Sequence, residues 1–289
     1  MKHIFIINTY TVNKELTNLL DRIKISCEKL NIDYKLELNG PDYSTEDILK
    51  KYKKTKNIII AVGGDGMINR ILNSIISTEN ILGFIPYGTG NDLYKSIKLQ
   101  FKEEINKCDI FKINDRYFIN VACFGIDADV ANNVIENNIN WFSKKQKYNL
   151  SLITTFLKYK PKNLEIKIKN ETFKDSFTTI SVCNGMYYGS GYNIAPSSKL
   201  NNGLLNVYLV KELNKISMLN LIFKMKKGKH EKDKRIKKIE TNELTIKSNK
   251  QIKCNIDGEI LEAKKFKIEL SKQIDIYYNK ELIKELNNV

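Results

Sequence analysis

The sequence predicts two domains, an α/β domain with a parallel sheet followed by a domain of antiparallel β-strands. Two observations lead to this prediction. The chain has 289 residues, which is more than one compact core usually holds. The apolar pattern also changes near residue 107, from apolar runs alternating with helical periods to segments that alternate every second residue. We therefore place the domains at 1–107 and 108–275.

The first domain follows a repeated strand–helix order. Its strands are continuous apolar runs, and its helices show apolar residues three and four apart. A sheet whose strands are apolar throughout is parallel and covered by helices on both faces. The expected elements are, in order, strand Ile4–Asn8, a helix with Leu16 to Leu30 on one face, strand Tyr34–Leu38, helix Ser44–Tyr52, strand Asn57–Val62, helix Met67–Ile76, strand Ile81–Pro86 and a helix from Asp92 to about Ile97.

The second domain consists mainly of short strands separated by turn residues, which indicates antiparallel pairing. The expected strands are Ile110–Ile113, Arg116–Ala122, Leu164–Lys169, Phe177–Asn184, Leu204–Val210, Glu243–Lys247, Gln251–Ile256 and Phe266–Leu270. The expected helices are Val130–Ile139, Tyr148–Tyr159 and Ser217–Lys226, and a short helical stretch over Tyr277–Leu286 ends the chain.

The chain is strongly basic, with 48 Lys and Arg residues against 33 Asp and Glu and a formal net charge of +15. Only four of the 48 are arginine, whose guanidinium group normally reads bases and phosphates. We therefore expect no nucleic-acid partner. Two interpretations of the charge stay open, a lysine bias along the whole chain and attraction to an anionic membrane surface. The basic run Lys224–Lys238 fits a solvated helix end as well as a lipid-facing surface.

Several classes of protein are not expected. No run of about 18 apolar residues is present, so nothing in the sequence is predicted to span a bilayer. The first eight residues are too short an apolar stretch for a signal peptide, which indicates a cytosolic protein. Five scattered cysteines without CxxC spacing indicate reduced, buried thiols. Two distant histidines, His3 and His230, argue against histidine-based metal or triad chemistry.

Two glycine-rich turns each follow an apolar strand and precede a helix. They are Gly63-Gly64-Asp65-Gly66 and Gly88-Thr89-Gly90-Asn91-Asp92. In a parallel sheet both would lie at the carboxyl edge, where backbone amides and the helix dipole meet a phosphate. Asp65 and Asp92 add carboxylates where a phosphate or its magnesium would lie. For the first turn alone, an ordinary strand-to-helix turn with an aspartate cap is the alternative.

Neither turn matches the two best-known phosphate motifs. GxxxxGK[ST] is absent, and no GxGxxG follows the first strand. A P-loop site and a nicotinamide site are therefore not expected.

These motifs make the chain resemble the diacylglycerol kinase catalytic-domain family of lipid kinases, which includes sphingosine kinases, ceramide kinases and soluble bacterial lipid kinases. The first turn resembles the family's GGDGT motif, and Gly83–Leu93 resembles its G-x-(I/L)-P-x-G-T-x-N-D-(F/L) motif. Further similar segments follow in order at Phe118–Ala122, Gly125–Val130, Asn184–Gly185, Gly189–Gly191, Ala195–Pro196, Asn202–Leu205 and Asp257–Glu259. The resemblance covers almost the whole chain.

The resemblance implies a first domain similar to the nucleotide domain of phosphofructokinases and NAD kinases, and a β-sandwich second domain. Residues 276–289 would return to the first domain. ATP and Mg²⁺ would bind between the two domains. The residues implied to hold the nucleotide are Asn8, Gly63, Gly64, Asp65, Gly66, Gly88, Thr89, Gly90, Asn91 and Asp92, with Asp65 also holding the metal.

The resemblance also implies which carboxylates carry the chemistry. Asp257 would be the general base, and Glu259 would support it. An Ile-Asp-Gly-Glu sequence between two strands is also an ordinary hairpin turn, and this alternative stays open. Either Asp127 or Asp129 would face the lipid headgroup.

Three positions depart from the family pattern. Asn8 is followed by Thr-Tyr-Thr-Val where the family has NPxSG, so only the asparagine is kept. Met67 stands where the family has Thr or Ser, which removes a hydroxyl donor. Asn202 stands where bacterial members hold a structural magnesium with an aspartate, so a neutral amide would bind that metal weakly or not at all.

The expected function is an ATP- and magnesium-dependent lipid kinase, with diacylglycerol as the first candidate acceptor and phosphatidic acid as the product. We expect a cytoplasmic enzyme associated peripherally with the membrane that holds its substrate, and a homodimer stays open. The alternatives are another lipid acceptor such as a sphingoid base or phosphatidylglycerol, a soluble substrate such as NAD or a sugar phosphate, and a catalytically weak regulator that binds lipid or nucleotide.

Overall fold

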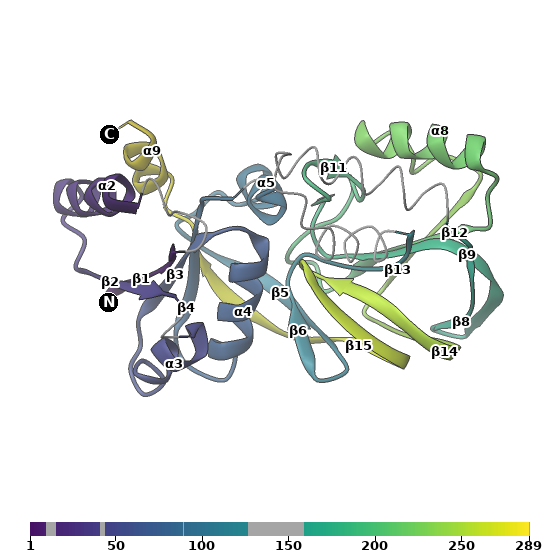
Figure 1. Cartoon of the computed structure of the whole chain (residues 1–289), viewed down its shortest axis with the longest axis horizontal. Helices are drawn as coiled ribbons and strands as arrows, with labels where there is room; N and C mark the ends of the chain where they lie inside the picture. The colour runs from purple at the N-terminus through teal and green to yellow at the C-terminus, as the bar shows by residue number, and fades with distance from the viewer. Residues whose placement is uncertain (10–15, 41–43, 89, 127–158, 289) are drawn as a thin grey trace. The chain divides into compact units, whose positions relative to one another are not determined.

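The computed structural model describes residues 1–9, 16–40, 44–88, 90–126 and 159–288 (Figure 1). The chain forms two compact units. The first unit contains residues 1–88, 101–108 and 273–289, and the second contains 89–100 and 109–272. The C-terminal residues 273–289 therefore group with the start of the chain. Residues 89–100 group with the second unit, although the sequence analysis places them in the first domain.

The first unit is an α/β domain built on a parallel sheet, as the sequence predicts. Its strands lie in the order β15, β4, β3, β1 and β2, and each neighbouring pair is parallel. Ile7 lies opposite Val62, and Gly63 lies opposite Pro86, so these strands end at one edge. The bounds are β1 His3–Asn8, β2 Tyr34–Asn39, β3 Ile58–Gly63, β4 Ile81–Pro86 and β15 Glu259–Tyr277, of which only the end from Gln273 belongs to this unit.

Helices cover both faces of this sheet. Figure 1 shows α2 and α9 together on one side and α3 and α4 on the other. Phe5 and Ile7 of β1 belong to the same buried cluster as Leu19 and Ile23 of α2 and Leu282 of α9. The bounds are α2 Leu16–Lys29, α3 Thr45–Lys50, α4 Asp65–Ile75 and α9 Lys280–Asn288. Continuous apolar strands thus find apolar partners above and below, which is why the parallel arrangement is stable.

The second unit is a β-sandwich of antiparallel strands. Its main order is β13, β12, β9, β7, β14 and β15, while β8 pairs with both β9 and β14, and β6 pairs with β5. The bounds are β5 Ile105–Ile113, of which the part from Asp109 belongs to this unit, β6 Arg116–Phe118, β7 Val121–Gly125, β8 Lys162–Ile168, β9 Glu171–Cys183, β12 Leu205–Lys211, β13 Ile236–Thr241 and β14 Glu243–Ile256. A small hairpin, β10 Tyr187–Tyr188 with β11 Tyr192–Asn193, and helices α5 Asp92–Gln100 and α8 Lys215–Lys226 complete it.

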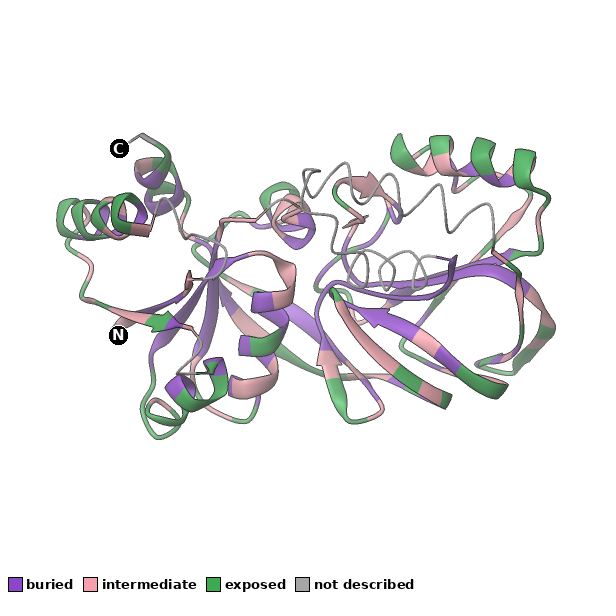
Figure 2. Cartoon of the chain, in the orientation of Figure 1, coloured by how far each residue is buried: buried purple, intermediate pink, exposed green. Residues whose placement is uncertain are grey.

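The sandwich closes around one apolar core. One end of β9 and one end of β14 pair with β8, and their other ends pair with β7, so the strands wrap around the space between them. Figure 2 shows buried residues along the strands of this unit. The largest side chains of the core are aromatic, namely Phe111, Phe118, Phe124, Phe177 and Phe266.

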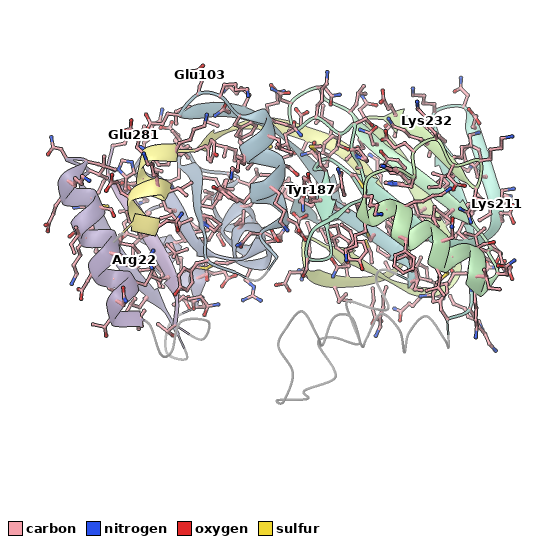
Figure 3. The ribbon with its side chains drawn as sticks, turned by 90° about the horizontal axis from the view of Figure 1, so that it is seen from above. Arg22, Glu103, Tyr187, Lys211, Lys232 and Glu281 are labelled. Atoms are coloured by element: carbon pink, nitrogen blue, oxygen red, sulfur yellow. The ribbon has the colours of Figure 1, made fainter. Side chains whose placement is uncertain are left out.

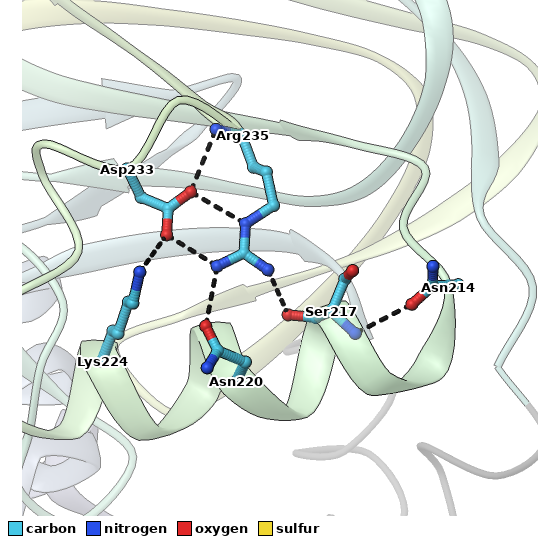
Figure 4. Close-up of polar contacts among 6 residues, drawn as sticks. All are labelled: Asn214, Ser217, Asn220, Lys224, Asp233 and Arg235. Carbon is cyan, nitrogen blue, oxygen red and sulfur yellow. Dashed lines mark hydrogen bonds and ion pairs between the residues drawn. The ribbon is translucent and has the colours of Figure 1, made fainter.

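A polar cluster binds helix α8 to the connection that leads into β13 (Figure 4). Asn214 caps the helix by accepting a hydrogen bond from the Ser217 amide at 2.8 Å. The Arg235 guanidinium donates to the Ser217 carbonyl at 2.8 Å and to both oxygens of Asp233. Lys224 donates to the same carboxylate at 2.7 Å. The hydrogen bonds from Arg235 are the main reason why the pKa of Asp233 is lowered, so this carboxylate stays charged and holds the helix in place.

One predicted strand is interrupted in the structure. The sequence predicts one strand over Arg116–Ala122, but the structure has β6 and β7 with a break between them. The backbone amides of Ile119 and Asn120 donate to the carboxylate of Asp257 instead of to a neighbouring strand. The prediction of a single strand here is therefore wrong.

Two other strand predictions are also corrected. The predicted strands Glu243–Lys247 and Gln251–Ile256 are one strand, β14, whose pairing with β15 shifts in register between Lys247 and Ile252. Strand β13 begins in the last three residues of the basic run Lys224–Lys238 and continues to Thr241, and no strand is predicted there from the sequence. The helix expected over 130–139 lies outside the described residues, and so does the one over 148–159 apart from Tyr159.

All five cysteines are buried, which confirms that part of the sequence prediction. Within the described ranges, no helix is long and apolar enough to cross a membrane.

Candidate active site

The first glycine turn lies where a buried strand leads directly into a helix. Strand β3 ends at Gly63, and α4 begins at Asp65. Gly64 is the N-cap residue, so no capping side chain competes with a ligand for the amides of the first helical turn. Asp65 places a carboxylate in that turn. The turn therefore combines a positive helix end for a phosphate with a carboxylate for a cation.

The start of the second glycine turn, at Gly88, lies beside the first turn at the same edge of the sheet. The Tyr87 amide, just after β4, donates to the Gly63 carbonyl at 3.1 Å. A Cβ atom placed on Gly64 would lie 3.8 Å from the Cα of Gly88. Asn8 is the last residue of β1, which neighbours β3. The structure thus brings Asn8, the first turn and Gly88 together at the carboxyl edge, as predicted.

Met67 takes a structural role beneath the first turn. Its side chain is buried, and its sulfur would lie 2.9 Å from a Cβ atom on Gly63. The methionine therefore folds back onto the end of β3. The family's hydroxyl at this position is replaced by an apolar contact that supports the turn from the inside.

A substitution at Gly64 separates phosphate binding from folding. Gly64→Ala is expected to lower the free energy of unfolding by only about 1 kcal/mol, the cost of alanine at an N-cap, because its φ of −94° is open to alanine and the added methyl group meets only an ordinary contact. The methyl group would occupy the space where a phosphate approaches the backbone, so we expect ATP affinity to fall about tenfold. Isothermal titration with magnesium-ATP checks the affinity. Unchanged ATP affinity in a normally folded variant would exclude this turn as a phosphate site.

The start of α5 is tied to a distant loop of the second unit. Asp92 is buried, and its carboxylate accepts a hydrogen bond from Lys95 at 2.9 Å and one from the Ser190 amide at 2.9 Å. Lys95 also donates to the Gly90 carbonyl at 2.8 Å. Residues Gly189–Gly191 all have positive φ, which lets this loop turn tightly over the helix start. Asp92 therefore has a clear positioning role, and its predicted contact with the nucleotide stays a prediction.

Asp257 forms the turn of the β14–β15 hairpin and also holds β6 and β7. Asp257 and Gly258 both have positive φ, as a two-residue hairpin turn requires, so the hairpin interpretation is confirmed. Its buried carboxylate accepts hydrogen bonds from the amides of Ile119, Asn120 and Val121 at 2.9, 3.1 and 2.8 Å. Both oxygens are therefore engaged by backbone donors.

The other hairpin carboxylate has a different environment. Glu259 is the first residue of β15, lies opposite Ile256 and is partly exposed. Beside the turn, Cys254 is fully buried. Burial, with a smaller contribution from the charge of Asp257, raises the pKa of the Cys254 thiol, so the thiol stays protonated.

Asn120 links the hairpin to α5 through hydrogen bonds. Its carbonyl accepts from the amides of Asn184 and Gly185, both at 2.9 Å, and its side-chain amide donates to the Tyr187 carbonyl at 3.1 Å. The Met186 amide donates to the Ser96 hydroxyl on α5 at 2.9 Å. Hydrogen bonds thus run from Asp257 through Asn120 and the 184–187 segment to α5, and we call this set of residues the polar network.

The predicted metal residue Asn202 does not fit a tight magnesium site. It is exposed, and its side-chain oxygen accepts a hydrogen bond from the Leu204 amide at 3.1 Å within its own turn. The nearby carboxylate of Asp109 accepts from the Gly203 amide at 2.6 Å. Within the described part of the chain, no three His, Cys, Asp or Glu side chains form a metal-binding group. Magnesium prefers charged oxygen ligands, so this turn lacks the donor set.

An apolar pocket lies between α8, β9, β12 and the β10–β11 hairpin. Its cavity volume is small, about 40 Å³. Tyr187, labelled in Figure 3, begins the hairpin that forms one wall. Burial in this environment raises the pKa of Tyr192. The lining residues are Ile126, Thr178, Thr179, Tyr188, Tyr192, Ile194, Val210, Met218, Leu221, Ile222 and Met225.

Two family models match the chain, one for each part. Residues 2–116 match the diacylglycerol kinase catalytic domain. Residues 120–273, more than half of the chain, match the YegS C-terminal NAD kinase beta sandwich-like domain. The chain belongs to the diacylglycerol kinase catalytic-domain family.

Similarity to individual proteins is consistent with this family. "Putative lipid kinase SAS0691" of Staphylococcus aureus (strain MSSA476) is 27% identical over 266 residues, which is 86% of each chain. The protein of strain JH9, "Putative lipid kinase SaurJH9_0749", has the same identity and coverage. The solved structure of a "putative diacylglycerol kinase from Bacillus anthracis str. Sterne" has a TM-score of 0.77 at 22% identity and covers 97% of this chain and 96% of that one. The similarity to this solved structure supports the fold alone. Family and relatives together identify the chain as a member of a kinase family.

Most of the predicted site residues lie within the part of the chain that the structure describes. Thr89, Asp127 and Asp129 lie outside the described residues, so their predicted roles stay predictions. Sequence reasoning assigned no role to Asn120, Ser190 or the pocket residues. Asn120 and Ser190 lie in segments that resemble the family, and that is the one signal that could have found them. The pocket residues come from 126 to 225, and only the folding of the sandwich brings them together.

Proposed function

We propose that the protein is an ATP- and magnesium-dependent kinase that phosphorylates a hydroxyl group of a membrane lipid, with diacylglycerol as the first candidate and phosphatidic acid as the product. In this reaction the lipid oxygen bonds to the γ-phosphorus of ATP, the bond from that phosphorus to the bridging oxygen breaks, and ADP leaves. The hydroxyl proton passes to a carboxylate of the enzyme. The protein would work in the cytoplasm, peripherally associated with the membrane.

The carboxyl edge of the first unit's sheet, where Gly64 and Gly88 lie close together, supports the nucleotide part of the proposal. The N-terminus of α4 and the close approach of Gly64 to Gly88 give a backbone surface without side chains, which fits a polyphosphate. Asp65 is the residue that would hold magnesium there. Bound magnesium would neutralise phosphate charge. The protein's own contribution is to fix the phosphate position by backbone amides.

One observation carries the lipid part of the proposal. The β10–β11 hairpin contributes Tyr188 and Tyr192 to the apolar pocket, while its turn is hydrogen-bonded to Asp92 at the start of α5. A small hairpin thus connects an apolar pocket with the segment that resembles the family's second phosphate motif. An apolar pocket next to polar positioning groups is typical of a site for an amphipathic ligand. An acyl chain would have to widen the pocket, and the flexible side chains of Met218 and Met225 allow this.

The contacts of the β14–β15 hairpin favour Glu259 as the carboxylate that receives the proton. Protonation of Asp257 would weaken three hydrogen bonds from backbone amides. Glu259 is partly exposed and lies two residues away on the same rigid hairpin. We therefore assign a positioning role to Asp257, and the base role that the resemblance gives it stays a prediction to be tested against this one.

A labelling experiment tests the proposed function. The purified protein is incubated with radiolabelled ATP and magnesium and with diacylglycerol, ceramide, sphingosine, phosphatidylglycerol or undecaprenol in mixed micelles. Label is expected in the lipid phase, most strongly with diacylglycerol. NAD and a sugar phosphate serve as soluble acceptors. Transfer to a soluble acceptor alone, or ATP binding without transfer to any acceptor, would contradict the proposal.

Filling the pocket is expected to discriminate between acceptors by chain length. Ile222→Trp adds a bulky ring to the pocket wall on α8, so the KM for a diacylglycerol with long acyl chains should rise about tenfold, while a short-chain analogue is affected less. Ile25→Trp, at an exposed position of α2 that does not line the pocket, is the control and should leave both KM values unchanged. Equal effects on both chain lengths would show that the acyl chain binds elsewhere.

A further inference from the structure

The outer face of α8 is apolar and exposed. Ile216, Leu219 and Phe223 are 82%, 45% and 66% exposed. They are spaced three and four residues apart, so they form one stripe along the helix. Met218 and Leu221 lie on the opposite face and are buried. Figure 2 shows this division, with exposed residues on the outside of α8 and buried ones toward the strands. Single exposed apolar residues are common, but a stripe of three on one helix indicates a binding surface.

The helix that carries the stripe is held rigidly. Arg235 donates to the Ser217 carbonyl near the start of α8, and Lys224 near its end donates to Asp233, so both ends of the helix are bound to the connection that leads into β13 (Figure 4). The stripe is therefore a property of the folded surface and does not result from a loosely attached helix. Binding to it would order few additional groups, which keeps the entropic cost of binding low.

Lysines gather at the C-terminal end of α8 and in the connection that follows it. Within the described part of the chain, five exposed lysines at the end of α8 and in the connection to β13 make no ion pair; Lys232 is labelled in Figure 3. They are Lys226, Lys227, Lys229, Lys232 and Lys234. Helix α8 itself contains no acidic residue. The two acidic residues of the connection, Glu231 and Asp233, are already engaged with Lys238 and with Lys224 and Arg235.

We propose that this face of α8 docks on the surface of an anionic lipid bilayer. The partner must present negative charge to the lysines and an apolar layer to the stripe. A bilayer with acidic headgroups has both, and its charged and apolar layers lie close enough together to contact one helix at the same time. The inner face of the same helix forms a wall of the apolar pocket, so docking would place that pocket next to the source of its ligand. The inference rests on the proposed function for the identity of the ligand, but the docking surface itself is tested without any reaction.

Sedimentation with vesicles tests the docking surface. The full chain is mixed with vesicles of phosphatidylcholine, with or without 30 mol% phosphatidylglycerol, at about 0.1 M salt. We expect binding to the anionic vesicles. The double variant Ile216→Ser/Phe223→Ser and the double variant Lys226→Glu/Lys229→Glu should each bind at least about tenfold more weakly.

Matched controls decide between this surface and the general charge of the chain. Ile25→Ser/Leu99→Ser removes two exposed apolar residues elsewhere, and Lys53→Glu/Lys54→Glu makes the same change of charge elsewhere. Both controls should bind vesicles like the original protein. Equal losses in control and α8 variants, or binding that is independent of phosphatidylglycerol, would overturn the proposal. A change of oligomeric state in the α8 variants, measured by light scattering with vesicle binding unchanged, would show a protein interface instead.

Loss of vesicle binding and loss of activity are distinguishable. In mixed micelles, where lipid is presented without a bilayer, the α8 variants should keep the phosphotransfer of the original protein to within about twofold, because exposed substitutions rarely disturb the fold. If no lipid is phosphorylated but vesicle binding depends on α8 as described, the proposed function fails while the docking surface stands.

Discussion

Asp257→Asn is expected to lower the free energy of unfolding of the second unit by about 3 kcal/mol, because an amide can accept at one end only. The present carboxylate accepts from three backbone amides, and an asparagine would turn its own NH₂ group toward at least one of them. The donor left without a partner is buried and has no access to water. Thermal unfolding followed by circular dichroism should show a midpoint lower by roughly 6–12 °C. Kinase activity should fall together with the stability.

Glu259→Gln is the comparison that separates positioning from proton transfer. Its side chain is partly exposed at the start of β15, so the unfolding midpoint should change little. If this carboxylate receives the hydroxyl proton, kcat should fall between about a hundredfold and ten-thousandfold while the KM for ATP stays the same. A stable Asp257→Asn protein without activity, beside an active Glu259→Gln protein, would instead return the base role to Asp257.

The elements that the sequence predicts well are those whose stability depends on local pattern and burial. The predicted bounds of strand β4 agree with the observed ones, and the predicted bounds of helix α8 differ from the observed ones by two residues at the start. In both cases the apolar residues that define the period are the ones that fill the core or line the pocket. The two glycine turns were predicted for the same reason, since an apolar strand, a glycine turn and a helix follow each other directly in the chain.

What the sequence could not show depends on contacts between distant residues. The break between β6 and β7 is set by Asp257, which is more than 130 residues away, and nothing in Phe-Ile-Asn-Val-Ala itself signals it. The β10–β11 hairpin is too short to leave a period in the sequence, yet it forms a wall of the pocket and is bound to Asp92. Patterns of apolar and turn residues predict individual helices, strands and turns. The polar network and the pocket form only when the sandwich folds and brings distant segments together.

Gly185→Ala is expected to disrupt the polar network where it is most tightly packed. An added Cβ atom would lie 1.9 Å from the side-chain oxygen of Asn120 and 3.2 Å from the hydroxyl of Ser96. Asn120 is buried, and its side chain cannot move away without releasing its hydrogen bond to the Tyr187 carbonyl. We expect a loss of about 3 kcal/mol or more in stability, and the same purified protein should lose phosphotransfer to lipid. Thermal unfolding and the labelling assay measure the two effects.

Gly203→Ala is a control that makes the same chemical change without the clash. Its φ of +73° gives alanine a conformational cost of about 1–2 kcal/mol, but the added methyl group meets only Leu270 at 3.7 Å. This variant should be mildly destabilised and keep its activity. If Gly185→Ala behaved in the same mild way, the network between the hairpin and α5 would be soft enough to repack, and the positions of Asp257 and Asp92 would be independent of each other. A selective loss in Gly185→Ala would instead show that the carboxylate hairpin and the start of α5 are held by one rigid set of hydrogen bonds.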